Sequence, residues 1–326
     1  MTTLNLGKAL NEGLRSALTN DPSVVLLGED IGTLGGVFRV TDGLAAEFGG
    51  DRVRDTPISE SAIVGTAIGL ALRGYRPVCE IQFDGFVYPA FDQIVAHLAK
   101  FRARTNGHVR LPITIRIPFG GGIKAIEHHS ESNEAYFAHT AGLRVVSCST
   151  PSNAYDLMRA AIASDDPVIF YEPKRLYWDK EDVDLARAPE PGILDSAVVR
   201  RHGTDVTLVT YGPTVRLALT AAKIAAAEGR SIEVIDLCSL SPLDTDAVHA
   251  SVRKTGRAVV VHEAPTFLGM GAEIAASISH DCFYSLEAPV ERVGGYNVPY
   301  PHSRVEDEYL PDVDRLLDAI DRTFEE

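Results

Sequence analysis

Short apolar runs alternate with segments of helical periodicity through the first half of the chain. Nearly every position in these runs is apolar, so we expect strands at residues 24–28, 78–83, 113–117, 144–148 and 168–172. The segments between them predict helices over about 4–19, 61–73, 88–104 and 151–164. Gly74 stands where a helix C-terminus is capped, and Pro151 stands where a first-turn proline is favoured. Strands that are apolar on both faces and alternate with helices predict a parallel sheet covered on both sides.

The pattern changes between residues 178 and 205, where the chain is charged, carries two prolines and has no long helical period. We expect this stretch to connect two domains. The alternation then resumes, with strands expected at 206–212, 232–237 and 258–263 and helices at 214–229 and from about 271. One face of the last helix is expected to carry Val313, Leu316, Leu317, Ile320 and Phe324. The prediction is an α/β protein with two doubly wound, mostly parallel sheet domains, residues 1–180 and 205–326, and a linker at 181–204.

Composition is ordinary for a soluble globular protein, with 45% hydrophobic and 23% charged residues. The net charge of −14 argues against a general binder of nucleic-acid backbones, which needs clustered Lys and Arg. The N-terminus lacks a signal-peptide core and no run approaches 18 apolar residues, so we expect no membrane span. The cysteines show no CxxC pair or metal spacing, and we expect buried free thiols in a reducing cytoplasm: Cys79, Cys148, Cys238 and Cys282.

Three glycine clusters look like phosphate-binding loops, at residues 35–36, 49–50 and 120–122. None completes GxGxxG after a strand or GxxxxGK[ST], so an ordinary loop is favoured for each one taken alone. The stretch 118–131 (PFGGGIKAIEHHSE) is the exception, because it follows an expected strand and leads into two histidines. Open α/β sheets bind their ligands at the carboxyl ends of the strands.

The adjacent residues His128 and His129 point apart on either a helix or a strand, and no third ligand lies nearby in the sequence. We therefore discount a metal site. A single histidine on a glycine-rich loop suits a general acid, since histidine titrates near working pH. A surface histidine without a chemical role is the alternative, and composition alone does not reject it.

Glu60, in TPISESAIVG (residues 56–65), stands at the start of an apolar helix and is flanked by two serines. Its usual role would be to stabilise the helix N-terminus, and taken alone we favour that interpretation. Glu29 ends a strand that should be central, and is either a turn residue or a second carboxylate of a site. Phe86 lies in an aromatic-rich stretch and is either core or a stacking wall for a flat ring.

Six blocks in order along the chain closely resemble the beta chain of thiamine-diphosphate-dependent 2-oxo acid dehydrogenases. The first three are GEDIGTLGGVFRVTDGL from residue 28, TPISESAIVGTAIGLAL from 56 and EIQFDGFVYPAFDQI from 80. The others are EHHSESNEAYFAHTAGLRVV from 127, PVIFYEPKRLYW from 167 and HEAPTFLGMGAEI from 262. The resemblance covers essentially the whole chain and implies a transketolase-like pyrimidine-binding domain followed by a transketolase C-terminal domain.

The resemblance implies roles for the residues at matching positions. Glu60 would hydrogen-bond the aminopyrimidine ring of thiamine diphosphate and so activate the cofactor. His129 would assist transfer of the acyl group to a lipoyl arm. The remaining matches surround the pyrimidine, with a phenylalanine where many relatives have tyrosine: Glu29, Ile58, Gln82 and Phe86. His139 is expected to hold a turn.

The resemblance also implies partners. Relatives bind the diphosphate and Mg²⁺ through a Gly-Asp-Gly motif, which this chain lacks, so a separate alpha chain would supply them in an α₂β₂ heterotetramer. The acyltransferase core is a second implied partner, and its candidate docking surface is the segment 301–326, with nine acids and three arginines. Taken alone, that segment is favoured to be a solvated helix face. Relatives often hold a structural potassium ion with main-chain oxygens, at positions matching Leu111, Ile113, Thr114, Ala161, Ser164 and Asp166.

Within the family the sequence is most like the branched-chain, 2-oxoisovalerate type. Pyruvate-type chains usually show Gln-His-Ser-Gln where this chain has His-His-Ser-Glu at 128–131. The implied reaction is oxidative decarboxylation of branched-chain 2-oxo acids with reductive acylation of a lipoyl group, and pyruvate or acetoin is the alternative substrate. A single-chain transketolase or deoxyxylulose phosphate synthase would need more than 326 residues. A non-catalytic α/β binding or electron-transfer module would not need an acid at position 60.

Overall fold

A seven-stranded sheet, in which most strands are buried along their length, is built mainly by the first half of the chain. The computed structural model describes residues 1–188 and 190–325. Six strands are parallel and adjoin in the order β6, β7, β5, β4, β2, β3. Their bounds are β2 (Val24–Gly28), β3 (Val53–Asp55), β4 (Arg76–Glu80), β5 (Thr114–Phe119), β6 (Arg144–Ser147) and β7 (Val168–Pro173). The seventh, β12 (Ser239–Ser241), comes from the second half of the chain and pairs antiparallel with β6.

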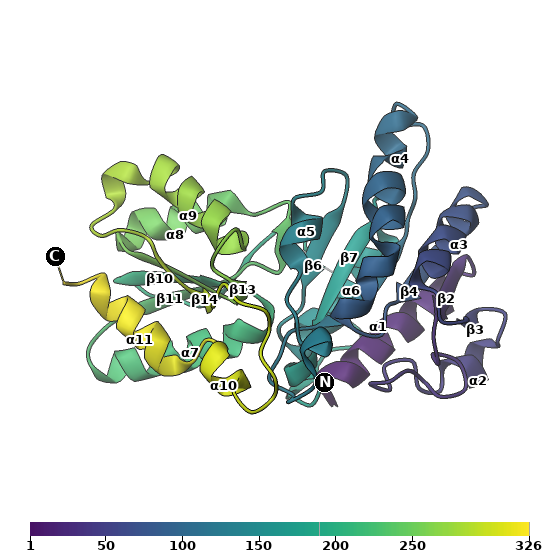
Figure 1. Ribbon diagram of the computed structural model, residues 1–326, viewed down its shortest axis with the longest axis horizontal. Helices are drawn as coiled ribbons and strands as arrows, with labels where there is room; N and C mark the ends of the chain where they lie inside the picture. The colour runs from purple at the N-terminus through teal and green to yellow at the C-terminus, as the bar shows by residue number, and fades with distance from the viewer. Residues whose placement is uncertain (189, 326) are drawn as a thin grey trace.

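Helices cover both faces of this sheet (Figure 1). Leu27 of β2 shares one apolar core with α3 (Glu60–Leu72) and α4 (Ala99–Arg104). The preceding residue, Leu26, shares the other core with α1 (Leu6–Asn20) and α6 (Pro151–Ala163). Two short helices lie in the connections, α2 (Leu44–Phe48) and α5 (Glu134–Ala138). The prediction of a parallel sheet covered on both sides is confirmed.

A second, five-stranded sheet forms from the second half in the order β14, β13, β10, β11, β9. Its strands are β9 (Val198–Arg201), β10 (Val206–Thr210), β11 (Ile232–Asp236), β13 (Ala258–Pro265) and β14 (Glu291–Gly295). Only β9, at one edge, is antiparallel. Helices α7 (Val215–Ala227) and α11 (Val313–Arg322) pack on one face, and α8 (Thr245–Thr255) and α9 (Met270–Asp281) on the other. A short helix, α10 (Glu306–Tyr309), precedes α11.

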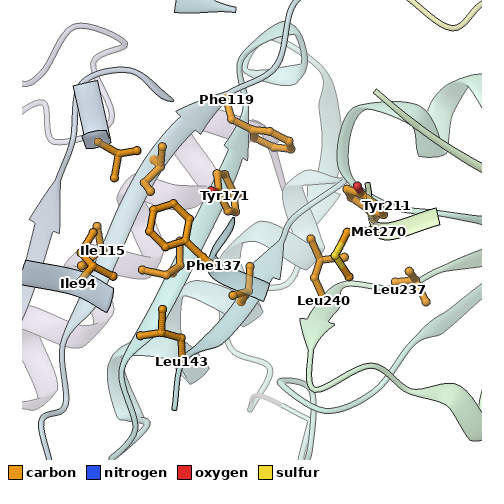
Figure 2. Packing of buried hydrophobic residues seen from close by; sticks show 14 of the residues in the cluster. Ile94, Ile115, Phe119, Phe137, Leu143, Tyr171, Tyr211, Leu237, Leu240 and Met270 are labelled. Carbon is orange, nitrogen blue, oxygen red and sulfur yellow. The ribbon is translucent and has the colours of Figure 1, made fainter. Parts of the chain in front are cut away.

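The two halves share one continuous apolar core (Figure 2). Phe137 and Tyr171 from the first half belong to the same buried cluster as Tyr211, Leu240 and Met270 from the second. Since interiors are closely packed, this core fixes how the two sheets sit against each other.

Several sequence predictions differ from the structure. The predicted linker contains β9 and most of another strand, β8 (Lys180–Val183), which pairs antiparallel with β1 (Thr2–Asn5). These strands escaped prediction because they are short, charged and at sheet edges, where no apolar run is needed. The division into domains at 181–204 stays a prediction. The single helix expected over 88–104 is a 3-10 segment (Asp84–Ala90), a π segment (Gln93–Leu98) and α4.

The predicted helix boundaries at Gly74 and Pro151 are confirmed. Gly74 has φ 91°, in the left-handed region, and its N–H donates to Ala71 O at 3.0 Å while Tyr75 N–H donates to Leu70 O at 3.1 Å. This pair of hydrogen bonds closes α3 in a Schellman motif. Pro151 opens α6 in its first turn. No helix within residues 1–188 and 190–325 is long and apolar enough to cross a membrane.

A fully buried ion cluster joins three adjacent strands of the first sheet. Arg116 on β5 donates to Glu80 of β4 at 2.5 Å and to Glu172 of β7 at 2.6 and 2.9 Å. Tyr177 Oη also donates to Glu172, at 2.7 Å. Arg116 is 1% exposed, and Glu80 and Glu172 are buried with it. If the arginine were removed, solvent could not solvate the two carboxylates in its place.

Replacing Arg116 with methionine should lower the free energy of unfolding by about 3–5 kcal/mol, because two buried carboxylates lose their cation. The matched control is Arg54→Met, since the partner of Arg54, Asp51, has a side chain that is 97% exposed. That substitution should cost less than about 1 kcal/mol. Urea unfolding followed by circular dichroism measures both, and equal losses would contradict the importance given to the buried cluster.

Candidate active site

The carboxyl ends of four adjacent strands bring the candidate residues to one edge of the first sheet. In sheet order the strands are β3, β2, β4 and β5. Ile58 and Glu60 follow β3, and Glu29 follows β2. Gln82 and Phe86 follow β4, and His129 follows β5. Their order in the sheet differs from their order in the chain. All six residues predicted for the site therefore lie at the edge where parallel sheets bind ligands.

Glu60 is the first residue of α3, as its sequence context predicts. Ser59 caps the helix through its Oγ, which accepts from Ala62 N–H at 3.4 Å. The turn before the helix is tied to β2, because Thr56 N–H donates to Gly28 O at 3.0 Å. The helix N-terminus stabilises a carboxylate at this position. Two residues earlier, the side chain of Ile58 is 86% exposed.

Glu29 is buried beside Glu60. Burial raises the pKa of its carboxyl group, and the negative charge of Glu60 acts in the same direction. Its Oε1 atom is buried and has no hydrogen-bond partner within the described residues. Gln82 Nε2 donates to Glu29 backbone O at 3.3 Å, which joins the ends of β2 and β4.

The His129 imidazole is held by aromatic rings. It stacks on Phe83 with ring centroids 3.9 Å apart and meets Phe86 edge-on at 5.0 Å. Its Nδ1 atom is buried and makes no hydrogen bond to any part of the chain that the structure describes. Burial lowers the pKa of His129 below its ordinary value of 6.5, and the charge of Lys174 contributes to the shift. The ring therefore stays neutral further into the acid range than free histidine does.

Gly85 permits this arrangement. A Cβ at that position would collide with the backbone carbonyl of His128, so only glycine lets the two loops meet. The glycine beside Phe86 in the sequence is thus explained by close approach of backbone atoms.

A buried ion pair behind His129 was missed by the sequence analysis. Lys174 and Asp84 are both fully buried and pair with each other, and Lys174 Nζ lies 5.7 Å from the centroid of Phe83. Burial raises the pKa of Asp84 to about 6. Asn133 donates to Asp84 backbone O at 3.0 Å. A lysine and an aspartate ninety positions apart leave no pattern that predicts their pairing.

The segments matched to a potassium site lie side by side, because Ile113 O accepts from Val168 N–H at 2.9 Å. Some of the matched oxygens already accept other hydrogen bonds. Ser164 O accepts from Arg76 at 3.0 Å, and Asp166 O accepts from Ser164 Oγ at 3.0 Å. The potassium site stays a prediction. No group of three metal-binding side chains occurs among the residues that the structure describes.

The candidate residues suit an aminopyrimidine ring. A flat ring with polar nitrogen atoms needs a carboxylate partner, apolar contacts on its faces and polar atoms at its rim. This edge offers the carboxylate of Glu60, the exposed side chain of Ile58, the ring of Phe86 and the unpaired Oε1 of Glu29. The residues present therefore fit the pyrimidine half of thiamine diphosphate.

Comparison with known sequences places the chain in a family. The sequence matches the transketolase pyrimidine binding domain over residues 2–179 and the transketolase C-terminal domain over residues 195–316. It is 58% identical over 322 residues to a pyruvate dehydrogenase E1 component subunit beta of Leifsonia xyli, covering 99% of this chain and 95% of the relative. The chain belongs to the family of 2-oxo acid dehydrogenase E1 beta subunits.

Other comparisons agree with this membership. The E1 beta chain is 56% identical over 323 residues to a 3-methyl-2-oxobutanoate dehydrogenase subunit beta of Mycobacterium tuberculosis, covering 99% of this chain and 92% of the relative. A solved structure described as a split gene transketolase, inactive beta4 tetramer, has a TM-score of 0.81 at 23% identity and covers 98% of each chain. That likeness shows the fold alone. The predicted family and the transketolase-like fold are confirmed, and the roles of the six site residues stay predictions.

Diethyl pyrocarbonate should carbethoxylate His129 of the E1 beta chain at a lower pH than it does N-acetylhistidine. The reagent attacks neutral imidazole, and the lowered pKa keeps the His129 ring neutral further into the acid range. Mass spectrometry of the peptide containing residues 127–131 measures the extent at each pH. A reactivity midpoint above 6.5 would contradict the burial assigned to this ring.

Proposed function

We propose that this E1 beta subunit, together with an alpha subunit and thiamine diphosphate, converts a 2-oxo acid and an oxidised lipoyl group into carbon dioxide and an S-acyl dihydrolipoyl group. The acyl carbon forms a bond to one lipoyl sulfur, the disulfide is reduced, and the acid proton ends on the other sulfur. The observation that carries the proposal is the meeting of Glu60, Glu29 and His129 at adjoining strand ends. Membership of the E1 beta family supports it.

Thiamine diphosphate, when bound, supplies the nucleophilic carbon and the electron sink for decarboxylation. In this proposal Glu60 holds a proton against a ring nitrogen of the pyrimidine. Because Ser59 makes the cap of α3, the Glu60 carboxyl group is not needed for capping and its oxygens are left for the ring. Burial and the nearby charge of Glu60 raise the pKa of Glu29, so a proton is favoured on Glu29.

The apolar residues orient the ring and keep water from it. Phe86 is fixed by its contacts with Phe83 and His129 and offers a stacking face. Ile58 offers an apolar contact that is otherwise exposed to solvent. Gln82 is held by the backbone of Glu29 and lines the rim.

His129 acts in this proposal as proton donor to the lipoyl sulfur during acyl transfer. The lowered pKa makes the protonated ring a stronger acid than free histidine, so the neutral ring takes up a proton first and then passes it on readily. Its place on the loop after β5, between aromatic rings, keeps it beside the other site residues.

An alpha subunit would complete the site in an α₂β₂ heterotetramer and would bind Mg²⁺ and the diphosphate. Support comes from the absence of a Gly-Asp-Gly motif in the sequence and from the open edge at which Ile58 lies. The acyltransferase core would be the second partner. The four free, buried cysteines suit a reducing cytoplasm.

For the substrate we favour branched-chain 2-oxo acids, on the motif His-His-Ser-Glu at 128–131. Pyruvate is the second candidate, since one relative with 58% identity is named a pyruvate dehydrogenase subunit and one with 56% a 3-methyl-2-oxobutanoate dehydrogenase subunit. Co-expression with a candidate alpha chain, followed by assays with 2-oxoisovalerate and pyruvate using a dye acceptor, decides between them. Full activity of the beta chain alone would overturn the shared site.

Glu60→Gln should reduce dye-linked decarboxylation by about 10²–10⁴-fold, because an amide cannot share the carboxyl proton. The fold should persist, since Ser59 still caps α3. Steady-state assay of the co-expressed complex measures the loss, and Glu228→Gln, an exposed position at the end of α7, is the matched control. Near-normal decarboxylation by the Glu60 variant would refute its assigned role.

His129→Ala should reduce acylation of a free lipoyl domain by about 10²-fold or more, the usual contribution of a positioned acid. Dye-linked decarboxylation should fall much less, because that assay bypasses transfer to sulfur. His139→Ala, at an exposed helix end, is the matched control. Equal losses in the two assays would argue against the donor role.

A further inference from the structure

The loop that carries His129 is held by the second half of the chain. This loop, residues 120–126, runs from β5 to the short 3-10 segment Glu127–His129. The N–H of Gly121 donates to the carboxylate of Glu263 on β13. The N–H groups of Gly122 and Lys124 donate to the two carboxylate oxygens of Glu306, at 3.0 and 3.1 Å. The loop resembles an anion-binding loop, and the anions are carboxylates of the same chain.

The three consecutive glycines are explained by this contact. A Cβ on Gly121 would collide with the hydroxyl group of Tyr300. A Cβ on Gly120 would lie 2.8 Å from Glu263 Oε1, and Gly120 has φ 82°, in the left-handed region. Gly122 has φ 84°, and a Cβ there would lie 2.9 Å from Cδ of Arg175. Glycine is therefore needed at each position for the loop to approach the second half.

Glu306 is the centre of the contact. It is the first residue of α10 and is fully buried, although its neighbours Asp307 and Glu308 are exposed. Tyr300 Oη donates to Glu306 Oε1 at 2.8 Å, so the carboxylate accepts three hydrogen bonds in all. Lys124 Nζ lies 3.8 Å from Oε2. A buried carboxylate with this set of donors holds the loop strongly, because charge-assisted hydrogen bonds are about twice as strong as neutral ones.

The His129 ring itself is not held by hydrogen bonds of the kind that hold the loop. Its Nδ1 atom is without a hydrogen-bond partner within the described residues, and its ring is held by contacts with Phe83 and Phe86. The position of its backbone therefore depends on the loop that precedes it. Glu306 holds that loop at Gly122 and Lys124, seven and five residues before His129.

We propose that Glu306 is a positioning residue for His129, and that the second half of the chain serves the active site by clamping the loop 120–126 through this carboxylate. The role of His129 in acyl transfer rests on the proposed function, whereas the clamp itself does not. Glu306 belongs to the acidic segment 301–326, for which the sequence favoured a solvated helix face and offered a docking surface as the alternative, and its burial removes it from either kind of surface.

Hydrogen exchange measured by mass spectrometry on the co-expressed complex tests the clamp directly. Glu306→Gln should accelerate exchange of peptide 120–126 by about tenfold or more, because an amide accepts through only one oxygen and the loop opens more often. Glu308→Gln, exposed and two residues away, should leave the rate as in the unmodified chain. Exchange of peptide 120–126 in Glu306→Gln within about twofold of the unmodified chain would overturn the clamp.

Tyr300→Phe is a second variant, in case Glu306→Gln does not fold. It removes one of the three donors to the carboxylate and nothing else, so exchange of the loop should rise by a smaller factor, about threefold. Unchanged exchange in this variant would count against the clamp.

Two readouts on His129 separate positioning from a purely structural role. In Glu306→Gln, the carbethoxylation rate of His129 should change at least about threefold, and the ratio of lipoyl acylation to dye-linked decarboxylation should fall about fivefold or more. A faster-exchanging loop with both readouts unchanged would refute positioning. If the unmodified complex decarboxylates no 2-oxo acid, the proposed function fails, and the carbethoxylation rate then decides the positioning role by itself.

Discussion

The buried cluster of Arg116 with Glu80 and Glu172 is the interaction on which the site depends. It joins β4, β5 and β7 through charge-assisted hydrogen bonds among side chains that are buried from solvent. Tyr177 links the cluster to the aromatic side chains near the site. Its hydroxyl group donates to Glu172, and its ring stacks on Phe38 with centroids 4.7 Å apart. A buried ion cluster tolerates little displacement, since each carboxylate needs its partner in place.

Aromatic contacts connect the buried ion cluster to His129. Phe38 meets Phe83 edge-on at 5.5 Å, and Phe83 stacks on His129. Lys174, which is buried and paired with Asp84, lies 5.7 Å from the centroid of Phe83 and supports that ring. The chemistry proposed for His129 thus relies on rigid, mostly apolar packing, which keeps an otherwise unanchored imidazole in one place and lowers its pKa.

The two halves of the chain have different tasks at this edge. The first sheet supplies all six of the predicted site residues, through the ends of four parallel strands. The second half supplies carboxylates that hold the glycine-rich loop, and β12 extends the first sheet at its far edge. A shared apolar core makes this cooperation possible, since it fixes the two sheets against each other.

The sequence by itself determined the buried strands, most helices and the family, because apolar runs, helical periods and ordered motifs are local properties of the chain. It also placed Glu60 at a helix start, where Ser59 provides the cap. Only the tertiary structure decided that β3, β2, β4 and β5 adjoin, that Lys174 meets Asp84, and that Glu306 is buried in an acidic segment. Such contacts join residues far apart in the chain, and they form because buried charges must find partners that no local pattern identifies.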